Sequence, residues 1–227
     1  MHDRRVTRII TPGTLIDENF MDPNTNNYVL AIHLVDPAAD SPPAMSSVLG
    51  LAWLDLSTGH FFTQTTTLTE LPSFLARIGP REVVLNEGLQ MSKEHGIFSI
   101  LQEEYYLISY VNASEIKPIS EWSSRLESPI SARSLAGFTA QEIAAGSTLL
   151  EYVEARLQGS HLKLQPPTRQ SDMMGIDKNT LRALEIKKTI RDDNFAGSLL
   201  HTIRRTNTKG GARLLDSWLC KSFQGLF

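Results

Sequence analysis

Short apolar runs alternate with helix-like segments through the first half of the chain, and this alternation limits the fold more than any other feature. The strand-like runs are 28–32, 49–54, 60–64, 82–85 and 105–111. The helix-like segments between them are 69–77, which Thr69 would cap, and 92–103. A pattern of this kind is typical of an α/β layer. We therefore expect a mixed sheet with helices packed on it.

The segment 48–65 predicts a β-hairpin whose turn is Ser57-Thr58-Gly59. Asp55 and Ser57 are expected to close this turn through side-chain to backbone hydrogen bonds, while Gly59 adopts a positive φ. The same aspartate would suit a metal-dependent nuclease if a second carboxylate stood nearby, and Glu87 after a later strand is the one candidate. Because a nuclease site needs more carboxylates than these two, we favour the turn for Asp55.

After Ser114 the pattern changes, and no further strand is expected. Residues 116–135 are rich in proline and serine and predict a linker. Three capped helices should follow: one from Thr139 to Leu157, which Gly159 would end, one from Asp177 through Ile190, and one from Thr208 to the end of the chain. The expected organisation is an α/β domain at 6–115, the linker, and a helical domain at 136–227.

The last of these helices would place four large apolar side chains on one face. That face needs a partner, and the remaining sequence offers only two other long helices. The helical part is therefore expected to be incomplete. The four side chains are those of Leu214, Leu215, Trp218 and Leu219.

Composition excludes several classes of protein. Apolar residues make up 41% and charged residues 21%, which is ordinary for a globular protein. No run approaches the roughly 20 apolar residues that a membrane span needs. A single cysteine, Cys220, excludes an intrachain disulfide framework and fits a reducing compartment. Since the first residues also lack the apolar run of a secretory signal, we expect an intracellular protein.

The sequence carries no recognisable catalytic, cofactor-binding or metal-binding motif. Neither the glycine-rich loop that holds nucleotide phosphates nor the one that holds dinucleotides is present, and no histidines stand at metal-ligand spacing. We therefore expect no enzyme activity, no catalytic residue, no bound cofactor and no metal on this chain.

Charge is distributed unevenly along the chain. The formal net charge is -3, yet the segment from Asp177 onward holds ten basic and five acidic residues. A basic helical segment can bind nucleic-acid phosphates, although a solvated helix face is the commoner reason for such a pattern. A nucleic-acid-binding module is thus an alternative function. Its candidate contact residues are Lys187, Lys188, Arg191, Arg204, Arg205 and Lys209.

Several separated segments, in the same order and spacing, together resemble the MutS family of DNA mismatch-repair proteins, and most closely its bacterial-type and organellar members. In the first half they are 8–14, 26–32, 54–61 and 80–85. In the second half they are 145–153, 174–186, 198–200, 206–208 and 211–219. The resemblance implies a connector domain with a ribonuclease-H-like α/β fold, followed by the beginning of the family's helical core. Residues 145–153 would be the first helix of that core.

The resemblance also implies a role. In the family, the connector and core link mismatch recognition to an ATPase, so we expect a coupling segment without catalysis of its own. Mismatched double-stranded DNA and a second MutS-type subunit would be the partners, and ATP and Mg²⁺ the cofactors of the full-length family. The mismatch reader should precede Val6, and the clamp and ATPase should follow Leu219, so the chain is expected to be truncated at both ends. Branch resemblance favours a mitochondrial location, with a nuclear one as the alternative.

Overall fold

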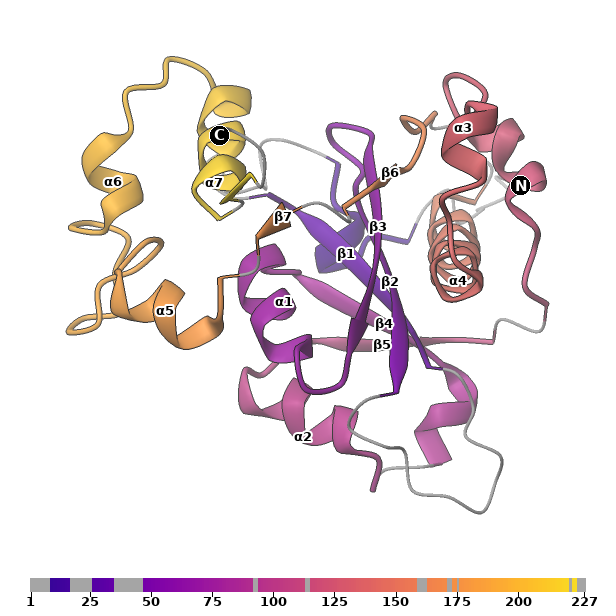
Figure 1. The fold of residues 1–227 in the computed structure, drawn as a ribbon, viewed down its shortest axis with the longest axis horizontal. Helices are drawn as coiled ribbons and strands as arrows, with labels where there is room; N and C mark the ends of the chain where they lie inside the picture. Colours follow the sequence, from indigo (N-terminus) through magenta and orange to yellow (C-terminus); the bar gives the residue numbers. More distant parts are fainter. Residues whose placement is uncertain are drawn as a thin grey trace, which may run out of the picture.

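The structure is a computed structural model that describes most of the chain. The described ranges are 9–16, 26–34, 47–91, 94–112, 115–158, 163–170, 173–174, 176–220 and 222–223. At its centre lies a six-stranded sheet with the strand order β5-β4-β1-β2-β3-β6 (Figure 1). The strands are β1 (Tyr28–Leu34), β2 (Val48–Asp55), β3 (His60–Thr67), β4 (Glu82–Asn86), β5 (Ile108–Val111) and β6 (Thr168–Arg169).

The sheet combines an antiparallel meander with parallel strands. β1, β2 and β3 pair antiparallel, with Tyr28 opposite Asp55 and Asp55 opposite His60. β4 runs parallel to β1, and β5 runs parallel to β4. Parallel neighbours need a crossover connection, which α1 (Leu71–Ile78) provides before β4 and α2 (Gly96–Glu103) provides before β5. The predicted mixed sheet with packed helices is confirmed.

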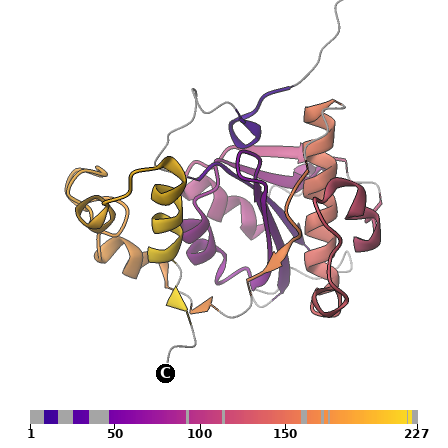
Figure 2. The same cartoon turned by 90° about the horizontal axis from the view of Figure 1, so that it is seen from above.

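Both faces of the sheet are buried at its centre, which explains why the sequences of β1, β2 and β4 are mostly apolar. Alternate strand residues such as Leu30 and Trp53 face α1 and α2 in one cluster. Their neighbours, such as Val29 and Leu54, face the long helix α4 (Ala140–Leu157) in a second cluster. Figure 2 shows α4 on the opposite side of the sheet from the last helices of the chain.

The capping box predicted for α4 is present. The Thr139 hydroxyl accepts a hydrogen bond from the Glu142 amide, and the Glu142 carboxylate accepts one from the Thr139 amide. The same buried carboxylate also accepts from Thr63 Oγ1 on β3 and from Arg169 Nε on β6. Because α4 packs on β1 and β2, it joins the sheet unit, whereas we expected residues 145–153 to begin the helical core.

The segment expected to be a linker also contributes to the sheet core. Residues Ile119–Arg125 form a 3-10 helix, η3, whose Trp122 side chain is fully buried. Trp122 packs against Phe61 of β3, with 5.6 Å between the ring centroids. It also packs against α4, where a Cβ added at Gly146 would lie 2.3 Å from the indole. The serine- and proline-rich composition of this segment therefore gave no indication that Trp122 is one of the largest side chains of the core.

Several expected boundaries are wrong by a few residues. The first helix begins at Leu71, and Glu70, not Thr69, is its N-cap. α2 begins at Gly96 after the N-cap His95, whereas the expected start at Ser92 lies outside the described residues. β5 begins at Ile108, because Tyr105 adopts a φ of 56° that a strand cannot accommodate.

The end of α4 agrees with the expected limit at Leu157. There Gln158, with a φ of 45°, is the left-handed cap. Gly159, expected to end this helix, lies outside the described residues.

Strands do occur after Ser114, contrary to expectation. β6 extends the sheet beside β3, and β7 (Met173–Met174) pairs with β8 (Ser222–Phe223). Each is only two residues long. Such short strands carry no alternating pattern, which is why the sequence did not reveal them.

The last part of the described chain is helical, as predicted. It contains α5 (Lys178–Ala183), α6 (Leu199–Ile203) and α7 (Lys209–Leu219), which lie together beyond α1 in Figure 1. Asp177 caps α5 and Thr208 caps α7 as expected. The helix expected to run through Ile190 instead ends at Ala183, because Glu185 adopts a φ of 47°. Three further short helices are α3 (Ala132–Leu135) and the 3-10 helices η1 (Pro12–Thr14) and η2 (Glu87–Met91).

Candidate interface between the sheet and the helical segment

Helix α7 buries its charged face and exposes much of its apolar face. Arg213 and Asp216 are only 6% and 7% exposed, whereas Leu214 and Trp218 are 48% and 56% exposed. Residues three apart lie on the same side of a helix, so Arg213 and Asp216 point together toward the sheet unit. A charged face is buried only where partners neutralise it. The contacts of these two side chains therefore define the interface.

Arg213 binds the turn between β2 and β3. Its Nη1 atom donates to Ser57 Oγ at 2.7 Å and lies 3.8 Å from Asp55 Oδ2. Ser57 Oγ donates in turn to Asp55 Oδ1 at 2.6 Å. A guanidinium, a hydroxyl and a carboxylate thus form a buried chain that links α7 to the end of the hairpin.

The role predicted for Asp55 in the turn is confirmed. Its carboxylate accepts hydrogen bonds from the Ser57 amide at 2.9 Å and from the Asn27 amide at 3.0 Å. Gly59 has the predicted positive φ, of 73°. Asp55 is therefore fully engaged by the β2–β3 turn, by the start of β1 and by Arg213.

The nuclease geometry that would need Asp55 and Glu87 together is not formed. Asp55 lies opposite Tyr28 at the start of β1, and β4 runs parallel to β1 from Glu82 onward. Glu87 follows the far end of β4, about 20 Å away along the strand direction at about 3.3 Å per residue. Within the described residues, no group of three or more His, Cys, Asp or Glu side chains is arranged to hold a metal ion.

A second ionic contact joins α7 to the end of α1. Lys187 Nζ lies 3.5 Å from Asp216 Oδ1 and donates to the Arg77 carbonyl oxygen at 3.3 Å. Asn26 Nδ2, just before β1, donates to Asp216 Oδ2 at 3.4 Å. Burial disfavours the charged ammonium, but the Asp216 carboxylate and the nearby Cys220 together hold the pKa of Lys187 above its usual value.

Apolar contacts complete this interface. Leu181, Ile186 and Cys220 are buried in one cluster, against which Ala76 of α1 packs. Burial raises the pKa of the Cys220 thiol from about 9 to about 11. The thiol is therefore neutral at physiological pH and behaves as a small apolar side chain.

The six basic residues proposed to contact nucleic acid do not form one surface. Lys187 is used in the interface, while Lys188 pairs with Asp193 at 2.7 Å and Arg191 lies 3.8 Å from Asp192. Lys209 opens α7. Arg204 and Arg205 line one hollow, and Lys187 and Lys188 line another. The early end of α5 is the reason, because residues 184–198 form a loop instead of a continuous helix face.

Sequence reasoning missed Arg213, Asp216 and Asn26 as interface residues. The available signal was the spacing of Arg213 and Asp216, which places two charges on one side of α7. We expected instead that the apolar side of the same helix would be the buried one. Nothing in the local sequence indicates which of the two sides meets the sheet.

A further buried carboxylate holds the sheet unit together internally. Glu82 on β4 accepts hydrogen bonds from Thr11 Oγ1, the Gly13 amide, Ser109 Oγ and the Tyr152 hydroxyl. Burial and the bond to Glu82 raise the pKa of Tyr152. The segment before β1, strand β5 and helix α4 are thus all tied to one side chain.

No helix among the described residues has the length and apolar character that crossing a membrane requires.

Comparison with protein families gives two matches along the chain. Residues 27–165 match the family described as MutS domain II, and residues 179–222 match the family described as MutS domain III. The first match includes α4, in agreement with its packing on the sheet. The second includes α5, α6 and α7. The interface of Arg213 with Asp55 therefore lies between the two matched segments.

Individual relatives are similar over nearly the whole chain. The DNA mismatch repair protein MutS of Microcystis aeruginosa is 32% identical over 231 residues, which cover 96% of this chain and 25% of that protein. The protein of the same name from Ehrlichia chaffeensis is 34% identical, covering 95% of this chain and 26% of that protein. The one from Rhodopseudomonas palustris is also 34% identical, covering 93% and 23%. The chain spans about a quarter of the length of these relatives.

Proposed function

This chain belongs to the MutS family of DNA mismatch-repair proteins, and we propose that it couples mismatch recognition to the ATPase of a longer repair protein. The chain would act without catalysis of its own. ATP and Mg²⁺ would be bound by other parts of that protein, and mismatched double-stranded DNA and a second MutS-type subunit would be its partners.

The observation that carries this proposal is the burial of the charged face of α7 against the sheet unit. Arg213 contacts the β2–β3 turn, and Asp216 is held by Lys187 and Asn26 near the end of α1. Buried ion pairs contribute little net stability but strongly disfavour any arrangement that leaves one partner alone. Such contacts favour discrete docked and undocked positions of α7, which is what coupling between two sites requires.

We also infer the finer fold and the domain limits. The antiparallel meander followed by parallel β4 and β5 supports a ribonuclease-H-like fold for the sheet unit. The packing of η3 and α4 supports a limit near residues 170–176, later than the limits expected from the sequence. The sheet unit would then end after β6, and the helical unit would begin shortly before α5.

We place this function inside the cell, where mismatched DNA is repaired. The relatives named above are bacterial, and they give no support to the mitochondrial or nuclear location expected from the sequence. The nuclease alternative loses its geometric basis, because Asp55 and Glu87 lie at opposite ends of the sheet. For the nucleic-acid-binding alternative, the six candidate contacts include two pairs that share a hollow, Arg204 with Arg205 and Lys187 with Lys188.

A chimera tests the proposed coupling. This chain would replace the matching segment of the Microcystis aeruginosa protein, and ATP hydrolysis would be measured with matched and mismatched duplex DNA. We expect the chimera to respond to the mismatch, and Arg213→Met to abolish that response while basal hydrolysis remains. Arg125→Met removes another arginine from an ion pair, with Glu154 within the sheet unit, and serves as the control. An unchanged mismatch response in Arg213→Met would contradict the proposal.

A further inference from the structure

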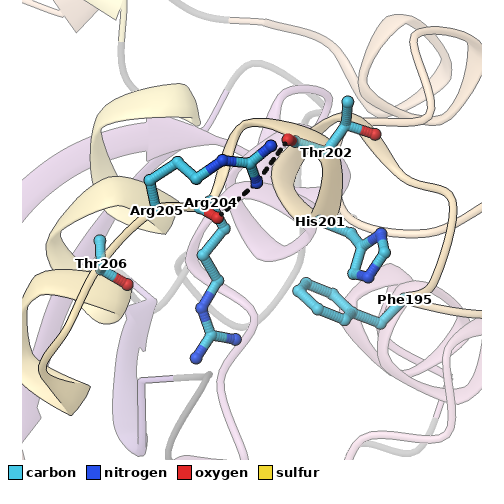
Figure 3. A pocket seen from close by; sticks show the side chains of 6 residues that line it. All are labelled: Phe195, His201, Thr202, Arg204, Arg205 and Thr206. Carbon is cyan, nitrogen blue, oxygen red and sulfur yellow. Dashed lines mark hydrogen bonds between the residues drawn. The ribbon is translucent and has the colours of Figure 1, made fainter.

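A hollow lies on the surface where α6 leads into α7. It has a volume of about 540 Å³ and is formed by one short stretch of chain. Figure 3 shows the six side chains that line it. They are Phe195, His201, Thr202, Arg204, Arg205 and Thr206.

The lining is cationic and contains no acidic residue. Arg205 Nη1 donates to the carbonyl oxygens of Thr202 at 3.3 Å and Arg204 at 3.1 Å, which holds its guanidinium in place (Figure 3). The Arg204 guanidinium lies over the Phe195 ring, 6.0 Å from its centroid. Within the described part of the chain, neither guanidinium has a carboxylate within ion-pair distance. Most of their N–H donors are therefore available to a ligand.

Two further polar side chains add to this donor set. Thr206 Oγ1 is buried and finds no hydrogen-bond partner among the described residues. His201 Nδ1 accepts from the Gly197 amide at 3.2 Å, which leaves Nε2 as the N–H donor of the ring. The His201 ring is held edge-on against Phe195 at 5.4 Å. The hollow thus presents donors and positive charge on side chains that are already oriented.

We propose that this hollow binds phosphate groups of a nucleic-acid backbone, with Arg204 and Arg205 as the principal contacts. Planar guanidinium groups match the geometry of phosphate oxygens and donate two hydrogen bonds at once. The inference rests on the proposed function, because a phosphate diester is the anion that a mismatch-repair protein meets in its substrate. The hollow would contact phosphates and not base edges, so its binding is independent of DNA sequence and of mismatches.

Titration of a short fluorescein-labelled duplex DNA with the 227-residue chain tests this site. Binding would be measured at several salt concentrations between about 50 and 200 mM. The test variant is Arg204→Ala with Arg205→Ala. The control is Lys188→Ala with Arg191→Ala, which removes the same charge from the same segment outside the hollow. All four residues are at least partly exposed, so circular dichroism and the thermal midpoint should match the wild type.

The test variant should bind DNA at least about tenfold more weakly than the wild type. The negative slope of log affinity against log salt should become shallower by about 1.8, because two phosphate contacts are lost. The control should change affinity less than about twofold. Equal losses of DNA affinity in both variants, or no DNA binding by the wild type at low salt, would contradict the proposed phosphate site. Such a result would leave the Arg213-dependent mismatch response of the chimera unaffected, so failure of the site and failure of the coupling proposal are separable.

Discussion

Asp55 shows how one residue type supports two different hypotheses until its neighbours are known. An aspartate at a strand end followed by Ser57 and Gly59 fits both a metal site and a hairpin turn. In the structure its oxygens are taken by the Ser57 and Asn27 amides and by the Ser57 hydroxyl, and Arg213 balances its charge. Asp55 therefore stabilises the turn and pairs with Arg213 of α7, so its carboxylate oxygens are not available to a metal ion.

A double-mutant cycle measures the Asp55–Arg213 pair. Asp55→Asn keeps the shape of the side chain and removes its charge, while Arg213→Met keeps apolar bulk and removes the cation. Each single change should lower the free energy of unfolding by about 2 kcal/mol, because it leaves one buried charge alone. The coupling energy from urea denaturation of the four proteins should be about 1–2 kcal/mol. A coupling energy near zero would show that the two charges do not interact across the interface.

The buried thiol of Cys220 predicts a pH dependence of stability. Its pKa is raised from about 9 to about 11 in the folded protein, so the folded state retains a proton that the unfolded state loses. Stability is therefore complete below pH 9 and falls as the pH rises toward 11. Between pH 8 and 9.5 the free energy of unfolding should fall by about 1 kcal/mol more in the wild type than in Cys220→Ala. Identical pH slopes for the two proteins would contradict the assigned environment of the thiol.

At the scale of elements, strands and caps could be predicted, but packing partners could not. The runs at 28–32 and 49–54 are apolar on both sides because the sheet is covered on both faces, and this is visible in a single sequence. Thr139, Asp177 and Thr208 mark helix starts through local hydrogen bonds. By contrast, the attachment of α4 to the sheet and the side of α7 that is buried depend on residues far away in the sequence.

Helix α4 and strand β2 approach so closely that only glycine fits at one position. A Cβ added at Gly50 would lie 1.9 Å from the Gln141 carbonyl oxygen in the first turn of α4. Gly50→Ala should therefore displace α4 and lower the free energy of unfolding by about 3 kcal/mol. The matched control is Gly210→Ala in α7, where an added Cβ meets nothing within 4 Å and stability should stay equal or rise by up to about 1 kcal/mol. Urea denaturation of both variants checks this, and a mild effect at Gly50 would contradict the close approach.

At the scale of the whole molecule, the sheet unit and the helical unit are joined by the polar contacts of α7 and by the apolar cluster of Leu181, Ile186 and Cys220 against Ala76 of α1. Arg213 and Asp216 face the sheet, while Leu214 and Trp218 remain largely exposed on the other side of α7. An exposed apolar stripe of this kind suits contact with further helices. The chain spans about a quarter of its relatives, and it matches them across the boundary between two of their domains. Its proposed function lies in how those two domains are held together.

Hydrogen exchange of the backbone amides shows whether the charged face of α7 holds the two units together. In the wild type, the amides of α7 (Lys209–Leu219) should be protected together with those of β1 and β2, because the helix is docked on the sheet unit. In Arg213→Met, protection of α7 should fall by about tenfold or more, corresponding to loss of at least about 1.4 kcal/mol of docking, and it should fall further than the protection of β1, β2 and α4. Arg125→Met should leave all four elements unchanged. If α7 keeps its protection in Arg213→Met, the charged face of α7 does not hold the two units together.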